Sequence, residues 1–224
     1  MIQYIFYLIL PFLFIFTSCT DGGTEISKFG YQEGQSLDTT DTKGLETATF
    51  AGGCFWCTEA YFERLAGVKS VVSGYSGGTS PNPTYAEVSA GNTDYAEAVQ
   101  VHYDPKEVSF EELVEVFFAT HDPTTLNRQG PDVGSQYRSV AFYRNPEEKK
   151  IIEDYIAELE RSGTYKSDIV TYVEPFKKFW EAEEYHQDYY RRNPDDPYVV
   201  SVAKPKVEKF EANYHTKLKP QFIN

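Results

Sequence analysis

The stretch GGCFWCTEA, at residues 52–60, connects a strand pattern to a helical pattern. Residues 47–51 before it read TATFA, and such a short β-branched and aromatic run indicates a strand. After it, apolar residues recur at helical spacing until Gly67 ends the pattern. The stretch therefore predicts a turn from a strand into a helix, with Thr58 as the helix N-cap.

Two cysteines, Cys54 and Cys57, stand one helical turn apart at this predicted helix start. The N-terminus of a helix offers free N–H groups and a positive dipole end, which stabilise a thiolate over a thiol. A lone cysteine in such a turn is usually a buried packing residue, but a pair three residues apart indicates a redox couple. Zinc needs about four ligands, and the four histidines are scattered, so no metal site is predicted.

Phe55 and Trp56 lie between the two cysteines. Beside a nucleophilic thiol, two large rings can line an apolar pocket for a small substrate group. Packing in the core is the alternative role for both, and the residue types alone leave the choice open. A thioredoxin-like dithiol oxidoreductase is a second function consistent with a CxxC pair at a helix start, although such motifs usually carry Gly-Pro between the cysteines.

Strand and helix patterns alternate through the rest of the chain. Alternating apolar residues predict strands at 68–75, 98–103, 137–143 and, as the last one, 169–173. Ser109 and Glu112 form a capping box before an amphipathic helix, and Asn145-Pro146 begins another helix that ends at Gly163. Residues 121–136 predict a long loop, and a Lys-rich helix is expected between 204 and 217.

This order of elements predicts an α+β fold, a single mixed α/β two-layer domain at residues 47–217 in which helices cover a central mixed sheet. We expect a ferredoxin-like or α–β roll core, a long irregular C-terminal region and a tail at 218–224. The 224 residues include 34 acidic and 21 basic side chains, for a net charge of −13. Nucleic acid is therefore not an expected partner, because phosphate binding needs clustered Lys and Arg.

Residues 1–18 carry no charge and are almost wholly apolar between 4 and 16. This run is too short to span a membrane and predicts a signal peptide. The sequence Phe16-Thr17-Ser18-Cys19 resembles a bacterial lipoprotein cleavage box, which makes Cys19 the expected lipidated residue. Phe16 replaces the usual Leu, so a secreted protein cut near Thr17 is the alternative. Residues 19–46 predict a flexible tether, and we expect a bacterial protein exported to the periplasm or anchored in the membrane as a lipoprotein.

A series of ordered blocks resembles the peptide methionine sulfoxide reductase A family from residue 46 to 210. The blocks are GCFW at 53–56, GYSGG at 74–78, PNPTYAEV at 81–88, AEAV at 96–99, Phe118 with HDPT at 121–124, RQG at 128–130, Asp132, GSQYRS at 134–139 and AEEYHQ at 182–187. The resemblance implies a monomeric peptide-methionine (S)-S-oxide reductase that acts on oxidised proteins or peptides. It implies no bound cofactor, only an external thiol reductant such as thioredoxin.

The resemblance also implies roles for individual residues. Cys54 matches the nucleophile that attacks the sulfoxide sulfur and becomes a sulfenic acid. Glu97 matches the acid that protonates the sulfoxide oxygen, and burial would raise its pKa toward neutrality so that it keeps a proton.

Other matching positions would hold the substrate. Tyr85 and Tyr137 match the tyrosines whose hydroxyls bind the oxygen, and Asp132 matches a supporting carboxylate. Phe55 and Trp56 match the pocket walls around the methyl group.

Three positions depart from the family pattern. Cys57 stands where many members have Gly, Val199 stands where many have a recycling cysteine, and Tyr95 replaces a common His, which we expect to alter the polarity of the pocket. The first two departures fit together if Cys57 attacks the Cys54 sulfenic acid and a thioredoxin-like donor reduces the resulting disulfide. Residues i and i+3 of a helix lie about 5–6 Å apart at Cβ, which is close enough for such a bridge after modest adjustment.

Overall fold

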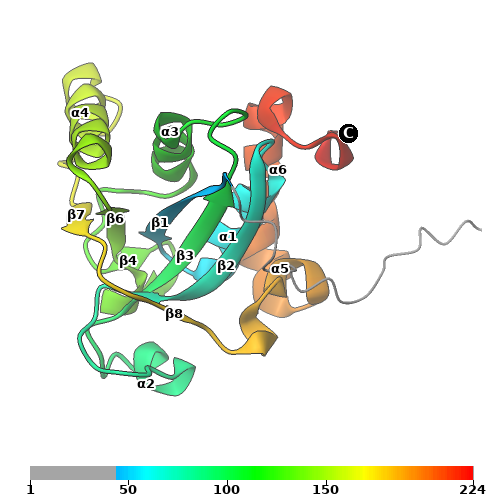
Figure 1. Ribbon diagram of the computed structural model, residues 1–224. Coiled ribbons are helices and arrows are strands. Elements are labelled where there is room, and N and C mark those ends of the chain that lie inside the picture. The colour runs from blue at the N-terminus through cyan, green and yellow to red at the C-terminus, as the bar shows by residue number, and fades with distance from the viewer. Residues whose placement is uncertain (1–43, 224) are drawn as a thin grey trace, which may run out of the picture. The chain divides into compact units, whose positions relative to one another are not determined.

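The computed structural model describes residues 44–223 (Figure 1). The predicted signal peptide at 1–18, the lipidated Cys19 and all but the last residues of the tether lie outside this range. Within residues 44–223, no helix is both long and apolar enough to cross a membrane.

A six-stranded sheet with the order β7-β6-β1-β3-β2-β8 forms the centre of the domain (Figure 1). Its strands are β1 Glu46–Gly52, β2 Val68–Ser76, β3 Ala96–Tyr103, β6 Ser139–Tyr143, β7 Tyr172–Pro175 and β8 Phe179–Glu181. Neighbouring strands are antiparallel except for β6 and β7, which are parallel. The sheet is therefore mixed, as the sequence predicted.

Helices and short elements surround this sheet. The α-helices are α1 Phe55–Arg64, α2 Tyr85–Ser89, α3 Phe110–Thr120, α4 Pro146–Ser162, α5 Tyr189–Arg192 and α6 Lys204–Tyr214. A π-helical turn at Val199–Ala203 precedes α6, 3-10 turns lie at Ser135–Tyr137, Glu184–His186, His215–Lys217 and Pro220–Phe222, and β4 Arg128–Gln129 pairs with β5 Asp132–Val133. This arrangement confirms the predicted α+β class.

The ends of the helices follow local sequence signals. The Ser109–Glu112 capping box is present at α3, and α4 begins with Asn145 as N-cap and ends at Gly163, which has a left-handed φ of 66°. The prediction of Thr58 as N-cap of α1 is wrong, because the helix begins at Phe55 and Cys54 occupies the N-cap. The turn that contains Gly52 and Gly53 is therefore shorter, and α1 starts earlier, than a cap at Thr58 would require.

Two other predictions need correction. Residues 121–136 are not a plain loop, since they contain the β4–β5 hairpin and the start of a 3-10 turn. The segment at 169–173 is not the last strand, because β7 begins only at Tyr172 and β8 follows it at the opposite edge of the sheet.

Stacked aromatic rings join β1 to the helices on one face of the sheet. The Phe50 ring lies 5.4 Å from Phe62 of α1 and 4.9 Å from Phe117 of α3, measured between ring centroids. Each such pair adds about 0.5–1.5 kcal/mol beyond the burial of its area. The stack lies next to the end of β1, so it fixes the position from which α1 begins.

Glu59 of α1 is a buried acidic residue, with 1% of its surface exposed. Its Oε2 atom has no hydrogen-bond partner among the described residues. Burial, with a smaller effect of the Glu63 charge, raises the pKa of Glu59 to about 9. The folded protein therefore holds this side chain as a neutral acid at pH 7.

The raised pKa of Glu59 predicts a loss of stability at alkaline pH. Between its unfolded value near 4.5 and about 9, the folded state binds the extra proton, so stability falls as pH rises through this window. We expect Glu59→Gln, which cannot ionise, to raise the melting temperature relative to wild type more at pH 9 than at pH 6. Thermal unfolding at both pH values measures this difference. The exposed Glu158→Gln is the control, and an equal shift at both pH values would contradict the prediction.

Candidate active site

The turn between β1 and α1 depends on Gly53. This residue has a φ of +96°, which side chains rarely adopt, and an added Cβ would lie 2.6 Å from Cγ of Gln129. Only glycine fits both constraints. The turn places Cys54 at the N-terminus of α1 and leaves its side chain facing a cavity.

This cavity has a volume of about 140 Å³. Its lining residues come from the β1–α1 turn, α2, β3, the β4–β5 hairpin and two later turns: Cys54, Phe55, Trp56, Tyr85, Glu97, Asp132, Tyr137 and Tyr198. Seven of these eight residues were predicted from the sequence. The other predicted site residue, Cys57, is buried beside Cys54 and does not line the cavity.

Glu97 lies on β3 and is almost completely buried, with 2% of its surface exposed. Its Oε2 accepts a hydrogen bond of 3.0 Å from the N–H of Phe55, the first residue of α1. Burial raises the pKa of Glu97 to about 8 in spite of this bond. The prediction that burial holds a proton on this carboxyl is confirmed.

The Cys54 thiol does not receive the expected support from the helix N-terminus. Burial raises its pKa well above the usual value, and the Cys57 hydrogen bond and the Glu97 charge add to the effect. The prediction of a stabilised Cys54 thiolate is therefore wrong for this pocket. The physical reason is burial, which removes the sulfur from the water that would stabilise a thiolate.

Cys57 is the more acidic member of the thiol pair. The pKa of Cys57 is lowered, mainly because its sulfur is hydrogen-bonded with Cys54, and the Lys206 ammonium contributes. Both cysteines are free thiols, and Cys57 has only 5% of its surface exposed. The two sulfurs are close enough to interact before any substrate arrives.

Two phenol groups face the same cavity. Tyr85 is the first residue of α2, and its backbone N–H donates to Glu183 Oε1 over 2.9 Å. Burial raises the pKa of Tyr85 to about 12, and burial also raises the pKa of Tyr137. Both hydroxyls therefore keep their protons at neutral pH and can donate hydrogen bonds to an oxygen.

Tyr198 is the lining residue that the sequence did not identify. Its hydroxyl donates to Asp132 Oδ2 over 2.7 Å, and its ring meets Trp56 edge-on with centroids 5.7 Å apart. It directly precedes the π-helical turn at Val199–Ala203, and π-helical turns are rare and often occur at functional sites. No periodic pattern marks residues 196–198, so the sequence offered no signal for this contact.

Trp56 is held by two neighbours from the chain near residue 186. Its ring stacks on Tyr189 with centroids 3.7 Å apart, and its indole N–H donates to Nδ1 of His186 over 3.1 Å. His186 also packs 4.2 Å from the Tyr85 ring. Phe55 belongs to the buried core and lines the cavity as well, so both roles left open by the sequence apply to it.

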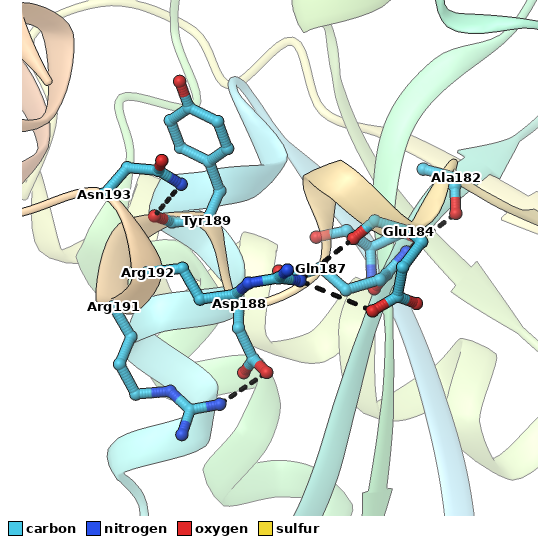
Figure 2. Close-up of polar contacts among 9 residues, drawn as sticks. Ala182, Glu184, Gln187, Asp188, Tyr189, Arg191, Arg192 and Asn193 are labelled. Atoms are coloured by element: carbon cyan, nitrogen blue, oxygen red, sulfur yellow. Dashed lines mark hydrogen bonds and ion pairs between the residues drawn. The ribbon is translucent and has the colours of Figure 1, made fainter. Parts of the chain in front are cut away.

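A network of polar contacts fixes the segment that carries these rings (Figure 2). The Gln187 side chain donates to the carbonyl of Ala182, and Arg191 forms an ion pair with Asp188. Asn193 Nδ2 donates to the carbonyl of Tyr189 over 3.1 Å. The segment that carries His186 and Tyr189, the two residues that hold the Trp56 ring, is therefore fixed by hydrogen bonds and an ion pair within itself.

Tyr95 does not line the cavity, so the prediction that it alters the polarity of the pocket is wrong. Its hydroxyl donates to the Ser80 carbonyl and accepts from the Trp180 indole N–H. In the part of the chain that the structure describes, no group of three or more His, Cys, Asp or Glu side chains is placed to hold a metal ion.

The sequence matches a known family over most of its length. The model of the peptide methionine sulfoxide reductase family covers residues 46–219. A peptide methionine sulfoxide reductase MsrA from Haloquadratum walsbyi is 55% identical over 173 residues, which are 77% of this chain and 98% of the relative. A second, MsrA 1 from Rhodopirellula baltica, is 56% identical over 176 residues, which are 79% of this chain and 91% of the relative.

Solved structures agree with these sequence matches. Methionine sulfoxide reductase A of Corynebacterium diphtheriae superposes with a TM-score of 0.61 at 37% identity, over 67% of this chain and 76% of that one. The reduced form of Mxr1 from Saccharomyces cerevisiae superposes with a TM-score of 0.63 at 38% identity, over 69% of this chain and 89% of that one. With the sequence matched from residue 46 to 219, the chain belongs to the peptide methionine sulfoxide reductase family.

Proposed function

We propose that this chain is a peptide-methionine (S)-S-oxide reductase in which Cys54 attacks the sulfoxide sulfur. The observation that carries the proposal is the composition of the 140 Å³ cavity. It brings a thiol, a carboxyl with a pKa of about 8 and two protonated phenols to one small space. The relatives at 55% and 56% identity are named as peptide methionine sulfoxide reductases.

The first step transfers one oxygen atom from the substrate to Cys54. The Tyr85 and Tyr137 hydroxyls bind the sulfoxide oxygen, and Glu97 gives it a proton as the sulfur of Cys54 attacks. The S–O bond of methionine breaks, the oxygen moves to Cys54 as a sulfenic acid, and the thiol proton of Cys54 replaces the proton that Glu97 lost. Methionine leaves as the sulfide.

The aromatic residues give the substrate its position. Phe55 and Trp56 form the apolar wall for the methyl group of methionine, and Tyr189 and His186 keep the Trp56 ring in place. Asp132 accepts the hydroxyl hydrogen of Tyr198, and this bond fixes the Tyr198 ring at the Trp56 edge.

Cys57 completes the oxidation of the pair. Its sulfur attacks the sulfur of the Cys54 sulfenic acid, which releases water and leaves a Cys54–Cys57 disulfide. A protein dithiol such as thioredoxin then reduces this disulfide. The hydrogen bond between the two thiols and the lowered pKa of Cys57 support this order.

The cellular location is proposed from the sequence of residues 1–19 alone. The uncharged apolar residues 1–18 and the box that ends at Cys19 support export to the periplasm or anchoring by lipid in a bacterial membrane. Mass spectrometry of the mature N-terminus distinguishes lipid on Cys19 from a cut near Thr17.

Replacing Cys57 by serine separates the two halves of the cycle. We expect Cys57→Ser to form one equivalent of methionine per enzyme from a sulfoxide peptide, because Cys54 and Glu97 are unchanged. Steady-state turnover with thioredoxin should fall to near zero, because no disulfide can form. Product per enzyme is measured by chromatography, with Cys54→Ser as the inactive control. Normal turnover of Cys57→Ser with thioredoxin would exclude Cys57 as the recycling residue.

The acid role of Glu97 predicts a specific pH dependence. The first turnover of wild type should slow as pH rises through about 8, because the carboxyl loses the proton that it gives to the sulfoxide oxygen. We expect Glu97→Gln to lower this rate by about 10²–10⁴-fold and to remove the decline near pH 8. Rapid quench between pH 6 and 9.5 measures the rate, with Glu181→Gln, which is exposed on β8, as control. A decline near pH 8 that persists in Glu97→Gln would assign it to another group.

A further inference from the structure

A second and larger cavity, of about 620 Å³, lies beside α6 and the end of α3. We call it the lysine groove, because Lys166, Lys206 and Lys209 line it together with Tyr61, Gln129 and Asn213 among others. It shares no lining residue with the cavity at Cys54. The groove is thus a separate site on the domain, and the reaction described above does not use it.

The charge of the groove is opposite to that of the whole chain. None of the three lysine ammonium groups has an ion-pair partner among the described residues. The eight ion pairs found within residues 44–223 all involve other side chains. The acidic residue in the lining is Asp122, whose Oδ1 accepts bonds from the backbone N–H and the hydroxyl of Thr124. In a chain of net charge −13, three unpaired ammonium groups in one groove favour an acidic occupant.

The lining also contains a histidine that adds no positive charge. Burial lowers the pKa of His121 to about 4, so its ring is neutral at pH 7. Both ring nitrogens already have partners, the Phe117 carbonyl and the Ser139 hydroxyl. The lysines therefore provide the positive charge of the groove.

The groove borders the side of α1 on which Cys57 lies. Tyr61 follows Cys57 by four residues, which places both on one face of the helix. The Lys206 charge reaches Cys57 and lowers the pKa of its thiol, after the larger effect of the Cys54 hydrogen bond. Gln129, another lining residue, contacts the position where a Gly53 side chain would lie. The substrate cavity thus meets the pair at Cys54, and the groove approaches it from the Cys57 side.

We propose that the lysine groove docks the acidic protein dithiol that reduces the Cys54–Cys57 disulfide. This inference rests on the proposed function, which requires such a reductant in every cycle. Charge complementarity identifies the occupant as a protein with carboxylates near its thiols. The groove lies on the Cys57 side of α1 and is separate from the cavity that takes methionine sulfoxide.

The reduction then balances as a two-electron transfer. A thiolate of the docked protein attacks the sulfur of Cys57, the disulfide bond breaks, and Cys54 takes the electron pair and a proton. The second thiol of the reductant attacks the reductant's first sulfur in the mixed disulfide, and Cys57 leaves and takes up a proton. The reductant leaves as a disulfide, and both cysteines of this chain are thiols again.

Charge reversal in the groove tests the proposal. Lys166→Glu/Lys209→Glu is compared with Lys106→Glu/Lys177→Glu, which changes the net charge equally at exposed lysines outside the groove. With thioredoxin as the probe, we expect the groove variant to raise the KM for thioredoxin about tenfold or more and to leave the KM for the sulfoxide peptide unchanged. Turnover with dithiothreitol and the methionine formed in one turnover should equal wild type.

Salt gives an independent measurement. Raising the salt from about 0.05 to 0.3 M should increase the KM of wild type for thioredoxin, because it screens the charges, and should have little effect on the groove variant. If the groove variant does not fold, Lys166→Gln/Lys209→Gln replaces it, with a smaller rise in KM expected.

Several results would overturn the inference. Equal KM values for thioredoxin in the groove and control variants would show that the lysines do not dock the reductant. A changed KM for the sulfoxide peptide would assign the groove to the substrate protein, and a loss of turnover with dithiothreitol would assign the lysines a structural role. Failure of wild type to form methionine in one turnover would instead reject the proposed function.

Discussion

The buried hydrogen bond from the Phe55 N–H to Glu97 connects the helix start to the centre of the sheet. It joins the first residue of α1 to β3 across 42 positions of sequence, and the rest of the site is arranged around it. The bond holds Glu97 in a place where burial keeps a proton on the carboxyl. One contact thus joins the helix of the nucleophile to the strand of the acid, and burial favours the protonated form of both groups.

Local signals predicted the fold well wherever a few neighbouring residues decide the structure. Caps such as Ser109 and Asn145, and the alternation in β3, depend on contacts within three or four residues, and the structure has all of them. The start of α1 was placed wrongly because Gly53 and the Glu97 contact decide it, and Glu97 is distant in sequence. β8 was missed for a similar reason, since it forms only by pairing with β2.

The candidate site likewise contains features that could be predicted from the sequence and features that depend on contacts between distant residues. The expected burial of Glu97 and the roles of the seven predicted lining residues came from a family resemblance that spans distant blocks. Tyr198 lies outside those blocks, and its link to Asp132 joins residues 66 apart. The direction of the Cys54 pKa could not be predicted, because it depends mainly on how deeply the folded chain buries the thiol.

The Gln187 side chain has a consequence for the behaviour of the protein in concentrated solution. β2 is nine residues long, but its outer edge pairs with β8 only from Gly74 to Ser76. The Gln187 amide accepts from the N–H of Ser73 and donates to its carbonyl, each over 2.9 Å, as a further strand residue would. Unpaired strand edges are templates for aggregation, and this amide shortens the open edge. The contact that orders the turn before Tyr189 thus also protects the sheet from joining another copy edge to edge.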